Sequence, residues 1–456
     1  MSTSDPIFAP PINRSMKELD RSFFRKQVPF LAAYFPQPKY LTPFMKSCKS
    51  DLLQISHVKH IIPMDNSKAV LLHPQITSPE DISPETKQKI QEFGIEIRPY
   101  TMDLDYSFWK ADDILRAVLP EDLVDETPTG FSQAGHIAHL NLRNAFKPFG
   151  KLIGQVILDK NPSVETVVDK ADTIANKFRT FNMTLLAGKD DFVVEQTESK
   201  CRFKFDFSKV YWNSRLATEH ERLVEKFDVG EVVGDVFAGV GPFAVPAGKK
   251  KVIVMANDLN PESYRYLKEN IESNRVEKFT KAYNLDGREF IQQAPKLLYD
   301  FHKGTPVIEE DIIKRRKVTD PKTGQSKSIK EITIKKTKTP KYYSHFVMNL
   351  PDSALSFLNE FIGLYSRHPS IMEEIQSDPE FKLPMIHVHC FEKFGLDEEP
   401  TVDELSRRVY DKICGLIEYE LDYDTIEFHT VRWVAPTKIM FCASFELPKE
   451  VAFKEL

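Results

Sequence analysis

The sequence predicts an α/β protein with a doubly wound sheet that ends in an antiparallel hairpin and is preceded by two smaller α+β domains. Strand-length apolar runs alternate with helical stretches over the second half of the chain. A Gly-x-Gly turn, Gly239 to Gly241, follows one of these runs, as in strand-loop-helix units that bind nucleotides. The length of 456 residues also exceeds one ordinary core, so several domains are expected.

Domain boundaries are placed where the pattern changes. Residues 1–110 mix short apolar runs with polar helical stretches, and residues 111–210 are richer in strands. Residues 211–456 carry the strand and helix alternation. A helix is expected from Met16 to Arg25, and one strand over Phe131 to Arg143.

The elements of the third domain follow in order. Strands are expected near Val232, Val252, Ala282, Phe346 and Ile386. Helices are expected over 261–273, 353–365 and 401–417. Two last strands, 425–432 and 437–445, are joined through Trp433 to Pro436 and predict the terminal hairpin.

Charge is distributed unevenly along the chain. The net charge of -5 is unfavourable for a nucleic-acid partner unless positive charge is concentrated locally. Between Lys303 and Lys341 there are 12 Lys and Arg against 5 Asp and Glu, a local +7 that leaves -12 elsewhere. The basic insert, 303–343, is open to two interpretations: a partly disordered solvated insertion, or a loop that becomes ordered on RNA.

Cysteine usage indicates a reducing compartment. The five cysteines are odd in number and lack CxxC spacing, which favours neither a disulfide framework nor a zinc site. His387, His389 and Cys390 offer ligand atoms, but strand alternation sends the two histidines to one face and Cys390 to the other. We therefore expect no metal, and no apolar run approaches the ~20 residues that a membrane-spanning helix needs.

Basic residues beside Phe23 and Phe24 are similar to those of a transit peptide, although Asp5, Glu18 and Asp20 are unusual for one. The expected location is the cytoplasm and nucleus, with a mitochondrial matrix pool left open.

Two carboxylates indicate which adenosine cofactor binds. Asp235 precedes Gly239 by four residues, where it can face an amino group but would repel a pyrophosphate. Asp258 follows the next strand and could accept two ribose hydroxyls. The pair favours S-adenosylmethionine over NAD and disfavours a dehydrogenase. The alternative for Asp258 is a cap on the helix that begins near Asn260.

Two further segments indicate a methyltransferase site. Asp286 lies in a turn suited to the amino group of adenine, and Asn349-Leu350-Pro351 ends an apolar strand at the mouth of the site. Both segments follow strands of the predicted sheet, where the carboxyl ends of the strands form ligand crevices.

From about Phe131 to the carboxyl terminus the chain resembles the archaeal and eukaryotic tRNA (guanine-37-N1)-methyltransferases. The resemblance implies the class I methyltransferase fold, a monomer, and a tRNA partner read at its anticodon loop and by its overall shape. The long basic insert and the extended amino terminus depart from the family pattern and leave the local RNA contacts open. The matching segments are Gly135 to Arg143, Asp159 to Pro162, Phe178 to Phe181, Arg215 to Glu219, Asp235 to Phe243, Asn349 to Pro351 and Val434 to Pro436.

The resemblance also implies roles for single residues. Glu219 would take the proton from guanine N1, Arg179 would stabilise the charge on O6, and Tyr211 would lie near the target base. Each has an ordinary alternative: a first-turn helix carboxylate, a surface cation and a core strand residue. The cofactor residues implied are His220, Asp258, Leu259, Asp286, Gly287, Asn349 and Pro351, with Asp235, Gly239 and Gly241 shaping the pocket.

Two rival functions remain. One is the S-adenosylmethionine-dependent aminocarboxypropyl transferase of wybutosine synthesis, against which the Arg215 to Glu219 and Asn349 to Pro351 segments argue. The other is a non-catalytic RNA-binding scaffold, against which the intact Asp235, Asp258, Asn349 and Glu219 argue.

Overall fold

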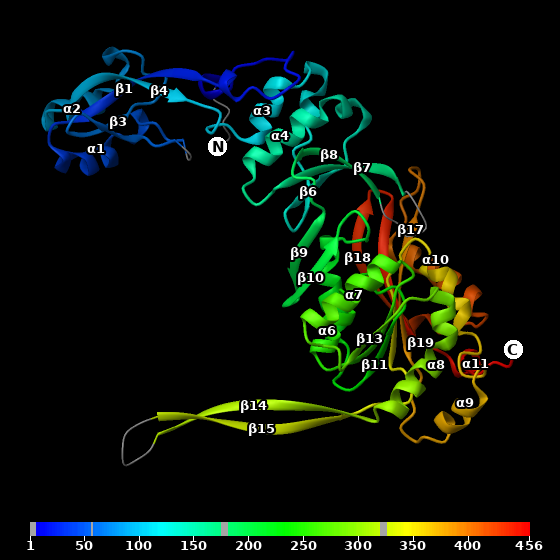
Figure 1. Ribbon diagram of the computed structural model, residues 1–456. Coiled ribbons are helices and arrows are strands. Elements are labelled where there is room, and N and C mark those ends of the chain that lie inside the picture. Colours follow the sequence, from blue (N-terminus) through cyan, green and yellow to red (C-terminus); the bar gives the residue numbers. More distant parts are fainter. Residues whose placement is uncertain (1–5, 56–57, 175–180, 320–325) are drawn as a thin grey trace. The chain divides into compact units, whose positions relative to one another are not determined.

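A computed structural model describes residues 6–55, 58–174, 181–319 and 326–456 (Figure 1). These residues form two compact units. The first comprises Met1–Ser132, Ala138–Lys170 and Thr184–Asp190, and the second Gln133–Ile137, Ala171–Met183 and Asp191–Leu456. Within the described ranges, no helix is long and apolar enough to cross a membrane.

The first unit begins with a four-stranded antiparallel sheet in the order β2-β3-β1-β4. Alternate residues of β1 enter two different cores, Phe30 and Ala32 on one face and Ala33 and Phe35 on the other. The strands are β1 (Lys26–Phe35), β2 (Ile61–Met64), β3 (Ser67–Leu71) and β4 (Glu96–Leu104), and the helices beside them are α1 (Leu41–Ser47) and α2 (Pro84–Phe93).

A second four-stranded sheet follows, in the order β5-β6-β7-β8. Its strands are β5 (Ser132–Ala134), β6 (Ile137–Leu140), β7 (Thr166–Ile174) and β8 (Phe181–Gly188), and the helices of this part are α3 (Ala111–Val118) and α4 (Gly150–Lys160). The two α+β regions predicted ahead of the main sheet are therefore present.

Two predictions for these regions are wrong. The helix expected from Met16 to Arg25 is only a 3-10 turn at Arg21–Phe23, because Asp20 caps it and β1 begins directly afterwards. The strand expected over Phe131 to Arg143 is two short strands, because the chain turns at Gly135 with a positive φ of 52°.

The second unit contains the predicted doubly wound sheet. Its order is β13-β12-β11-β16-β17-β19-β18; the first five strands are parallel, and β19 and β18 are antiparallel. The strands are β11 (Val232–Asp235), β12 (Ile253–Asn257), β13 (Thr280–Tyr283), β16 (His345–Met348), β17 (Met385–Lys393), β18 (Glu427–Ala435) and β19 (Lys438–Glu446). The terminal antiparallel hairpin is confirmed, although β18 continues through Trp433 and leaves only two residues for the turn.

Helices connect these strands, and a separate hairpin of β9 (Val193–Glu198) and β10 (Cys201–Asp206) precedes them. The predicted helices at 261–273 and 401–417 are confirmed as α7 (Pro261–Ser273) and α10 (Val402–Ile417). The predicted helix at 353–365 is a 3-10 helix, Ala354–Phe361. The 18-residue helix α8 (Gly287–Gly304) was not predicted. The α-helices are α5 (Ala217–Glu225), α6 (Ala244–Lys249), α7 (Pro261–Ser273), α8 (Gly287–Gly304), α9 (Pro369–Gln376), α10 (Val402–Ile417) and α11 (Lys449–Ala452).

The strand order positions the site. Connections leave β11 toward β12 on one side, and β16 lies on the other side of β11. The carboxyl ends of β11 and β16 therefore meet at a topological switch point, where open α/β sheets bind ligands.

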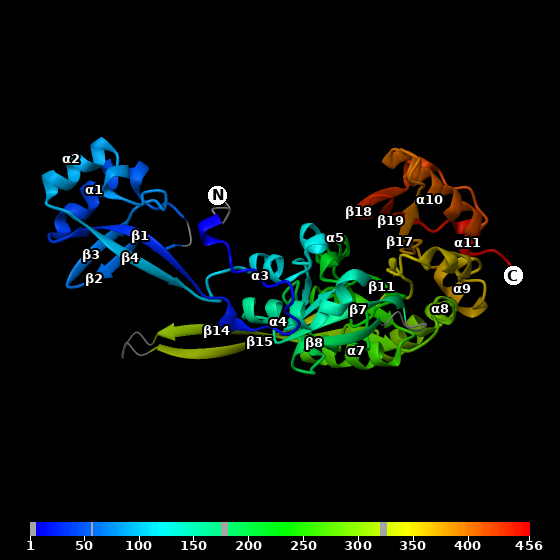
Figure 2. The same cartoon turned by 90° about the horizontal axis from the view of Figure 1, so that it is seen from above.

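The basic insert forms a two-stranded ribbon that extends beyond the main sheet in both views (Figures 1 and 2). In it, β14 (Val307–Thr319) pairs antiparallel with β15 (Ser326–Lys338) along their whole length. These two segments of the insert are therefore ordered strands, while residues 320–325, to which the expected partial disorder mainly applies, lie outside the described residues. Because the insert lies between α8 and the start of β16, the ribbon begins at the edge of the sheet opposite the switch point.

The resemblance implies a tRNA partner, and removing the ribbon is then expected to weaken tRNA binding and to flatten its salt dependence. Each neutralised phosphate contributes roughly 0.7 to 0.9 to the slope of log K against log salt. A short Gly-Ser link can close the chain, because the amide of Thr339 already donates to the carbonyl of Pro306 at 3.0 Å. Filter binding over a salt series measures the slope, and calorimetry should give unchanged cofactor affinity. An unaltered slope would mean that the ribbon makes no phosphate contact.

Candidate active site

The loop after β11 opens the site. Gly239 and Gly241 have positive φ angles of 55° and 100°. A Cβ at Gly239 would meet nothing within 4 Å, so the backbone there is open to a ligand. A Cβ at Gly241 would lie 2.8 Å from the Val245 side chain and 2.9 Å from that of Leu267, so this glycine serves close packing. Gly239 lines the cavity, whereas Gly241 lies outside its lining.

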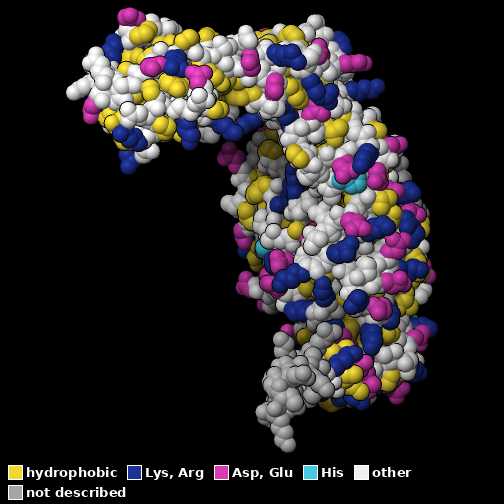
Figure 3. All heavy atoms as spheres, turned by 60° about the vertical axis from the view of Figure 1, so that its left-hand side comes forward, with side chains coloured by type: hydrophobic (Ala, Val, Ile, Leu, Met, Phe, Trp, Pro, Cys, Tyr) yellow, Lys and Arg dark blue, Asp and Glu magenta, His cyan; other side chains and the backbone are white. Residues whose placement is uncertain are grey.

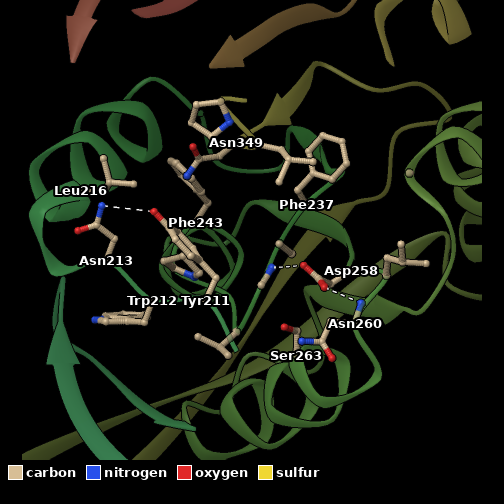
Figure 4. Close-up of a pocket in the computed structure, with 18 of the residues that line it drawn as sticks. Tyr211, Trp212, Asn213, Leu216, Phe237, Phe243, Asp258, Asn260, Ser263 and Asn349 are labelled. Carbon is tan, nitrogen blue, oxygen red and sulfur yellow. Dashed lines mark hydrogen bonds between the residues drawn. The ribbon is translucent and has the colours of Figure 1, made fainter. Parts of the chain in front are cut away.

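A cavity of about 530 Å³ lies at the carboxyl ends of β11, β12, β13 and β16 (Figure 4). This volume is within the range of cavities that hold a small molecule or cofactor. Aromatic rings supply much of its lining, which suits a flat heterocycle. They are Tyr211, Trp212, Phe237, Phe243, Phe357 and Phe391.

Asp258 follows β12 and organises the cavity. Its Oδ2 accepts from the amide of Gly239 at 2.8 Å and its Oδ1 from the amide of Asn260 at 2.9 Å (Figure 4). Burial raises the pKa of Asp258 to about 6, although these hydrogen bonds act in the opposite direction. A carboxylate has about four acceptor positions, so it can still accept from a ligand. The cap of α7 is Asn260, which accepts from the amide of Glu262 at 3.0 Å, so the helix-cap interpretation of Asp258 is wrong.

Three residues from neighbouring strand ends complete this part of the cavity. Asp286 caps α8 by accepting from the amide of Arg288 at 2.9 Å. A Cβ at Gly287 would lie 2.8 Å from the ring of Phe237, so a larger residue would displace that ring. The Oδ1 of Asn349 is buried and has no hydrogen-bond partner in the described part of the chain. Since buried acceptors are normally satisfied, this oxygen fits a donor on a bound ligand.

Tyr211 and His220 also line the cavity. The Tyr211 side chain is 47% exposed, so the interpretation as a core strand residue is wrong. Its hydroxyl accepts from the Nδ2 of Asn213 at 3.4 Å (Figure 4). His220 bonds Glu198 through Nδ1 at 2.6 Å and meets the ring of Phe243 edge-on, with centroids 4.7 Å apart.

Asp235 at the end of β11 is fully buried, and neither carboxyl oxygen has a hydrogen-bond partner among the described residues. Burial, with the nearby carboxyl group of Asp258, raises its pKa to about 8. Asp235 lies outside the cavity lining.

Glu219 on α5 is only 4% exposed. Both carboxylate oxygens accept from Arg222, at 2.7 and 2.8 Å, and Oε1 bonds Nε2 of His389 at 2.7 Å. Burial opposes ionisation, but these hydrogen bonds lower the pKa of Glu219 to about 2. Glu219 does not line the cavity; the ring of His389 lies 6.0 Å from that of Phe243, which does. One layer of side chains thus separates the carboxylate from the cavity.

The same cluster contains metal-ligand types. Ligand atoms of Glu219, His389 and Cys442 lie within 4.8 Å of one another. The guanidinium of Arg222, which donates to both oxygens of Glu219, supplies a positive charge that disfavours a cation there. His387 lies opposite Ser444 of β19 and bonds its hydroxyl at 2.8 Å, and His389 lies opposite Cys442 two residues away. The two histidines therefore lie on the same face of β17, as predicted.

Comparison with known proteins decides the family. A family profile of the TRM5/TYW2 methyltransferase domain matches residues 194–305, and a profile of the TYW2 N-terminal domain matches residues 111–191. The tRNA (guanine(37)-N(1))-methyltransferase of Candida albicans (strain SC5314 / ATCC MYA-2876) is 64% identical over 449 residues, covering 98% of this chain and 99% of that protein. The protein of the same name from Saccharomyces cerevisiae is 48% identical over 485 residues, covering 97% and 95%. The chain belongs to the tRNA (guanine(37)-N(1))-methyltransferase family.

Solved structures share the fold of this family member. Trm5b from Pyrococcus abyssi matches with a TM-score of 0.56 at 22% identity, covering 91% of this chain and 98% of that one. A structure described as the complex of aTrm5 and tRNALeu matches with a TM-score of 0.58 at 19% identity, covering 92% and 99%. The predicted class I methyltransferase fold is thereby confirmed.

Most residues predicted to form the site of this family member are brought together. Tyr211 lines the cavity, Glu219 lies one layer away, and Arg179 lies outside the described residues. Asp235 and Gly241 are the two predicted cofactor residues that lie outside the lining. Those that line it are His220, Gly239, Asp258, Leu259, Asp286, Gly287, Asn349 and Pro351.

Apart from Tyr211, the aromatic residues of the lining were not predicted to form the site. Phe237 and Phe243 flank the glycine turn, and that proximity could have revealed them. Phe357 and Phe391 enter from the connection after β16 and from β17, so only the strand order brings them to the cavity.

Proposed function

We propose that the chain transfers the methyl group of S-adenosylmethionine to N1 of guanine 37 of tRNA, giving 1-methylguanosine. The observation that carries this proposal is the 64% identity over 98% of the chain to a protein of that activity. The cavity at the switch point supports it, because its polar groups and rings match an adenosine and a base.

The residues present fit the cofactor. Asp258 is placed to accept from both ribose hydroxyls, and Asp286 or the unpartnered Oδ1 of Asn349 is placed to accept from an amino group. When bound, S-adenosylmethionine supplies a methyl group on a positively charged sulfur. The chain then chiefly orients the acceptor in line with that methyl group, and fixed geometry alone can lower a barrier substantially.

The guanine must lose its N1 proton as the new bond forms. Glu219 is ionised at neutral pH and is the proposed acceptor of this proton, while Arg179 would donate to O6. The layer that separates Glu219 from the cavity implies that RNA binding brings the carboxylate and N1 within hydrogen-bond reach. Tyr211, exposed at the cavity, is placed to contact the base.

The tRNA is proposed to present its anticodon loop to the cavity, because a base in such a loop can leave the stack and enter a pocket. Residues 1–110 are proposed to contact another part of the same tRNA and so to test its overall shape. The separate core around Phe35, Phe44 and Leu72 supports an independent binding role.

The test is methyl transfer from labelled S-adenosylmethionine to unmodified tRNA that carries either guanine or adenine at position 37. The proposal expects transfer to the guanine form alone, with a product heavier by one methyl group. Transfer to both forms would contradict the N1-guanine assignment. A mass increase of one aminocarboxypropyl group would instead assign the wybutosine reaction.

A further inference from the structure

The end of the β18–β19 hairpin carries a motif, Val434 to Pro436, that the proposed chemistry does not use. The motif lies at the same edge of the sheet as the cavity, because β17 and β18 end at that edge and β19 begins at it. We define the hairpin tip as Lys393, Phe394, Arg432, Trp433 and Lys438.

Trp433 is the main apolar feature of the hairpin tip. Its side chain is 47% exposed, yet its ring contacts that of Phe394 edge to face, with centroids 6.2 Å apart and planes at 89°. The strand register shifts between Trp433 and Ala435, a bulge of the kind that redirects side chains at the end of a strand. An exposed ring that is already held by a neighbour loses little freedom when it stacks on a ligand.

The hairpin tip also carries cations. Lys393 is exposed, Arg432 is half-buried, and neither forms an ion pair within the residues that the structure describes. The Nζ of Lys438 lies 3.6 Å from the centroid of the Phe391 ring and 3.7 Å from Oδ1 of Asp352. Both Phe391 and Asp352 line the cavity, so the hairpin tip is continuous with its rim.

We infer that the hairpin tip binds a nucleotide adjacent to the target guanine, with Trp433 stacked on its unpaired base and Arg432 and Lys393 at the flanking phosphates. The inference rests on the proposed function, which places single-stranded RNA at this rim. An exposed aromatic ring among unpaired cations is the combination that single-stranded nucleic acid requires: a surface for a base and charge for its backbone. Paired bases would offer no face for stacking, so the unpaired anticodon loop is the matching part of the tRNA.

Binding of full-length tRNA by the whole chain tests the inference. Trp433→Ala is expected to weaken binding by roughly fivefold to a hundredfold, the range measured for loss of one stacked base. Trp433→Phe should retain most of the affinity. Leu396→Ala removes a neighbouring side chain that is 89% exposed and serves as the control with unchanged binding. The double variant Arg432→Gln, Lys393→Gln should lower the salt slope by about 1 to 2.

Abasic tRNAs identify the stacked base. Two tRNAs are compared, one without a base at position 36 and one without a base at position 38. With one of the two, the wild type and Trp433→Ala should bind equally tightly, because the base on which Trp433 stacks is already absent and the two losses are not additive. Unchanged binding by Trp433→Ala, or a Trp433→Ala effect that persists with both abasic tRNAs, would overturn the inference. Failure of the wild type to methylate guanine 37 would instead overturn the proposed function, so the two failures are distinct.

Discussion

Glu219→Gln is expected to slow the single-turnover rate of methyl transfer by about 10²- to 10⁴-fold, the usual cost of losing a general base. Glutamine keeps the size of the side chain but cannot accept the N1 proton. The affinities for S-adenosylmethionine and tRNA should change little, because the carboxylate lies outside the cavity lining. Rapid-quench measurements at saturating enzyme separate the chemical step from binding.

The surroundings of Glu219 determine the pH dependence to expect. Its pKa of about 2 means that the carboxylate is ionised throughout the ordinary assay range, so a rate change between pH 6 and pH 8 should come from another group. The folded pKa lies below the unfolded value of 4.5, so the group stabilises the fold above pH 4.5 and this contribution is lost as the pH falls toward 2. Glu219→Gln should therefore also lower the melting temperature at neutral pH, and rates must be compared well below it.

Glu221→Gln is the matched control, because Glu221 is exposed on the same helix. It should leave the rate and the melting temperature unchanged. A near wild-type single-turnover rate for Glu219→Gln, with a lowered melting temperature, would give Glu219 a different role. It would then join α5 to β17 through His389, and the base would have to be another group.

Local signals explain which parts of the fold could be predicted. The buried parallel strands are continuous apolar runs. The start of α7 is marked in the sequence by the capping residue Asn260 followed by Pro261. The helix α8 was not predicted because Asp286, the residue that caps its start, was interpreted as part of a turn. Aspartate is common both in turns and at helix caps. At 354–361 the apolar spacing was helical, but the segment forms a 3-10 helix, a distinction that the spacing did not provide.

The site shows where sequence reasoning ends. Asp235 is the last residue of β11 and Asp258 directly follows β12, and both have the same chemistry, yet only Asp258 lines the cavity. The contact of Glu219 with His389 joins residues 170 positions apart and depends on the register of β17, which no local pattern encodes. Strand alternation correctly placed His387 and His389 on one face, but it could not identify Glu219 as the partner of His389.

Asp258→Ala is expected to raise the dissociation constant for S-adenosylmethionine by roughly 10²- to 10⁴-fold. Two hydrogen bonds from ribose hydroxyls to a carboxylate are lost, each worth about 1.5 to 3 kcal/mol. Asp258→Asn keeps one acceptor and should give an intermediate loss. Asp422→Ala is the control, because Asp422 also accepts from a backbone amide two residues later but lies outside the cavity. Calorimetry measures all four proteins.

The pH dependence of cofactor binding makes the same prediction sharper. The pKa of Asp258 in the ligand-free protein is raised to about 6, so S-adenosylmethionine affinity should fall as the pH drops below 6, by at most about tenfold per pH unit. The folded pKa exceeds the unfolded 3.8, so this group lowers the stability of the ligand-free protein as the pH rises from about 4 through 6. Asp258→Asn should abolish the pH effect on affinity, whereas the buried Asp235, whose pKa is also raised, still lowers the stability as the pH rises. If its affinity instead equals that of the wild type at every pH, the carboxylate only holds the amides of Gly239 and Asn260, and the ribose must be bound elsewhere in the cavity.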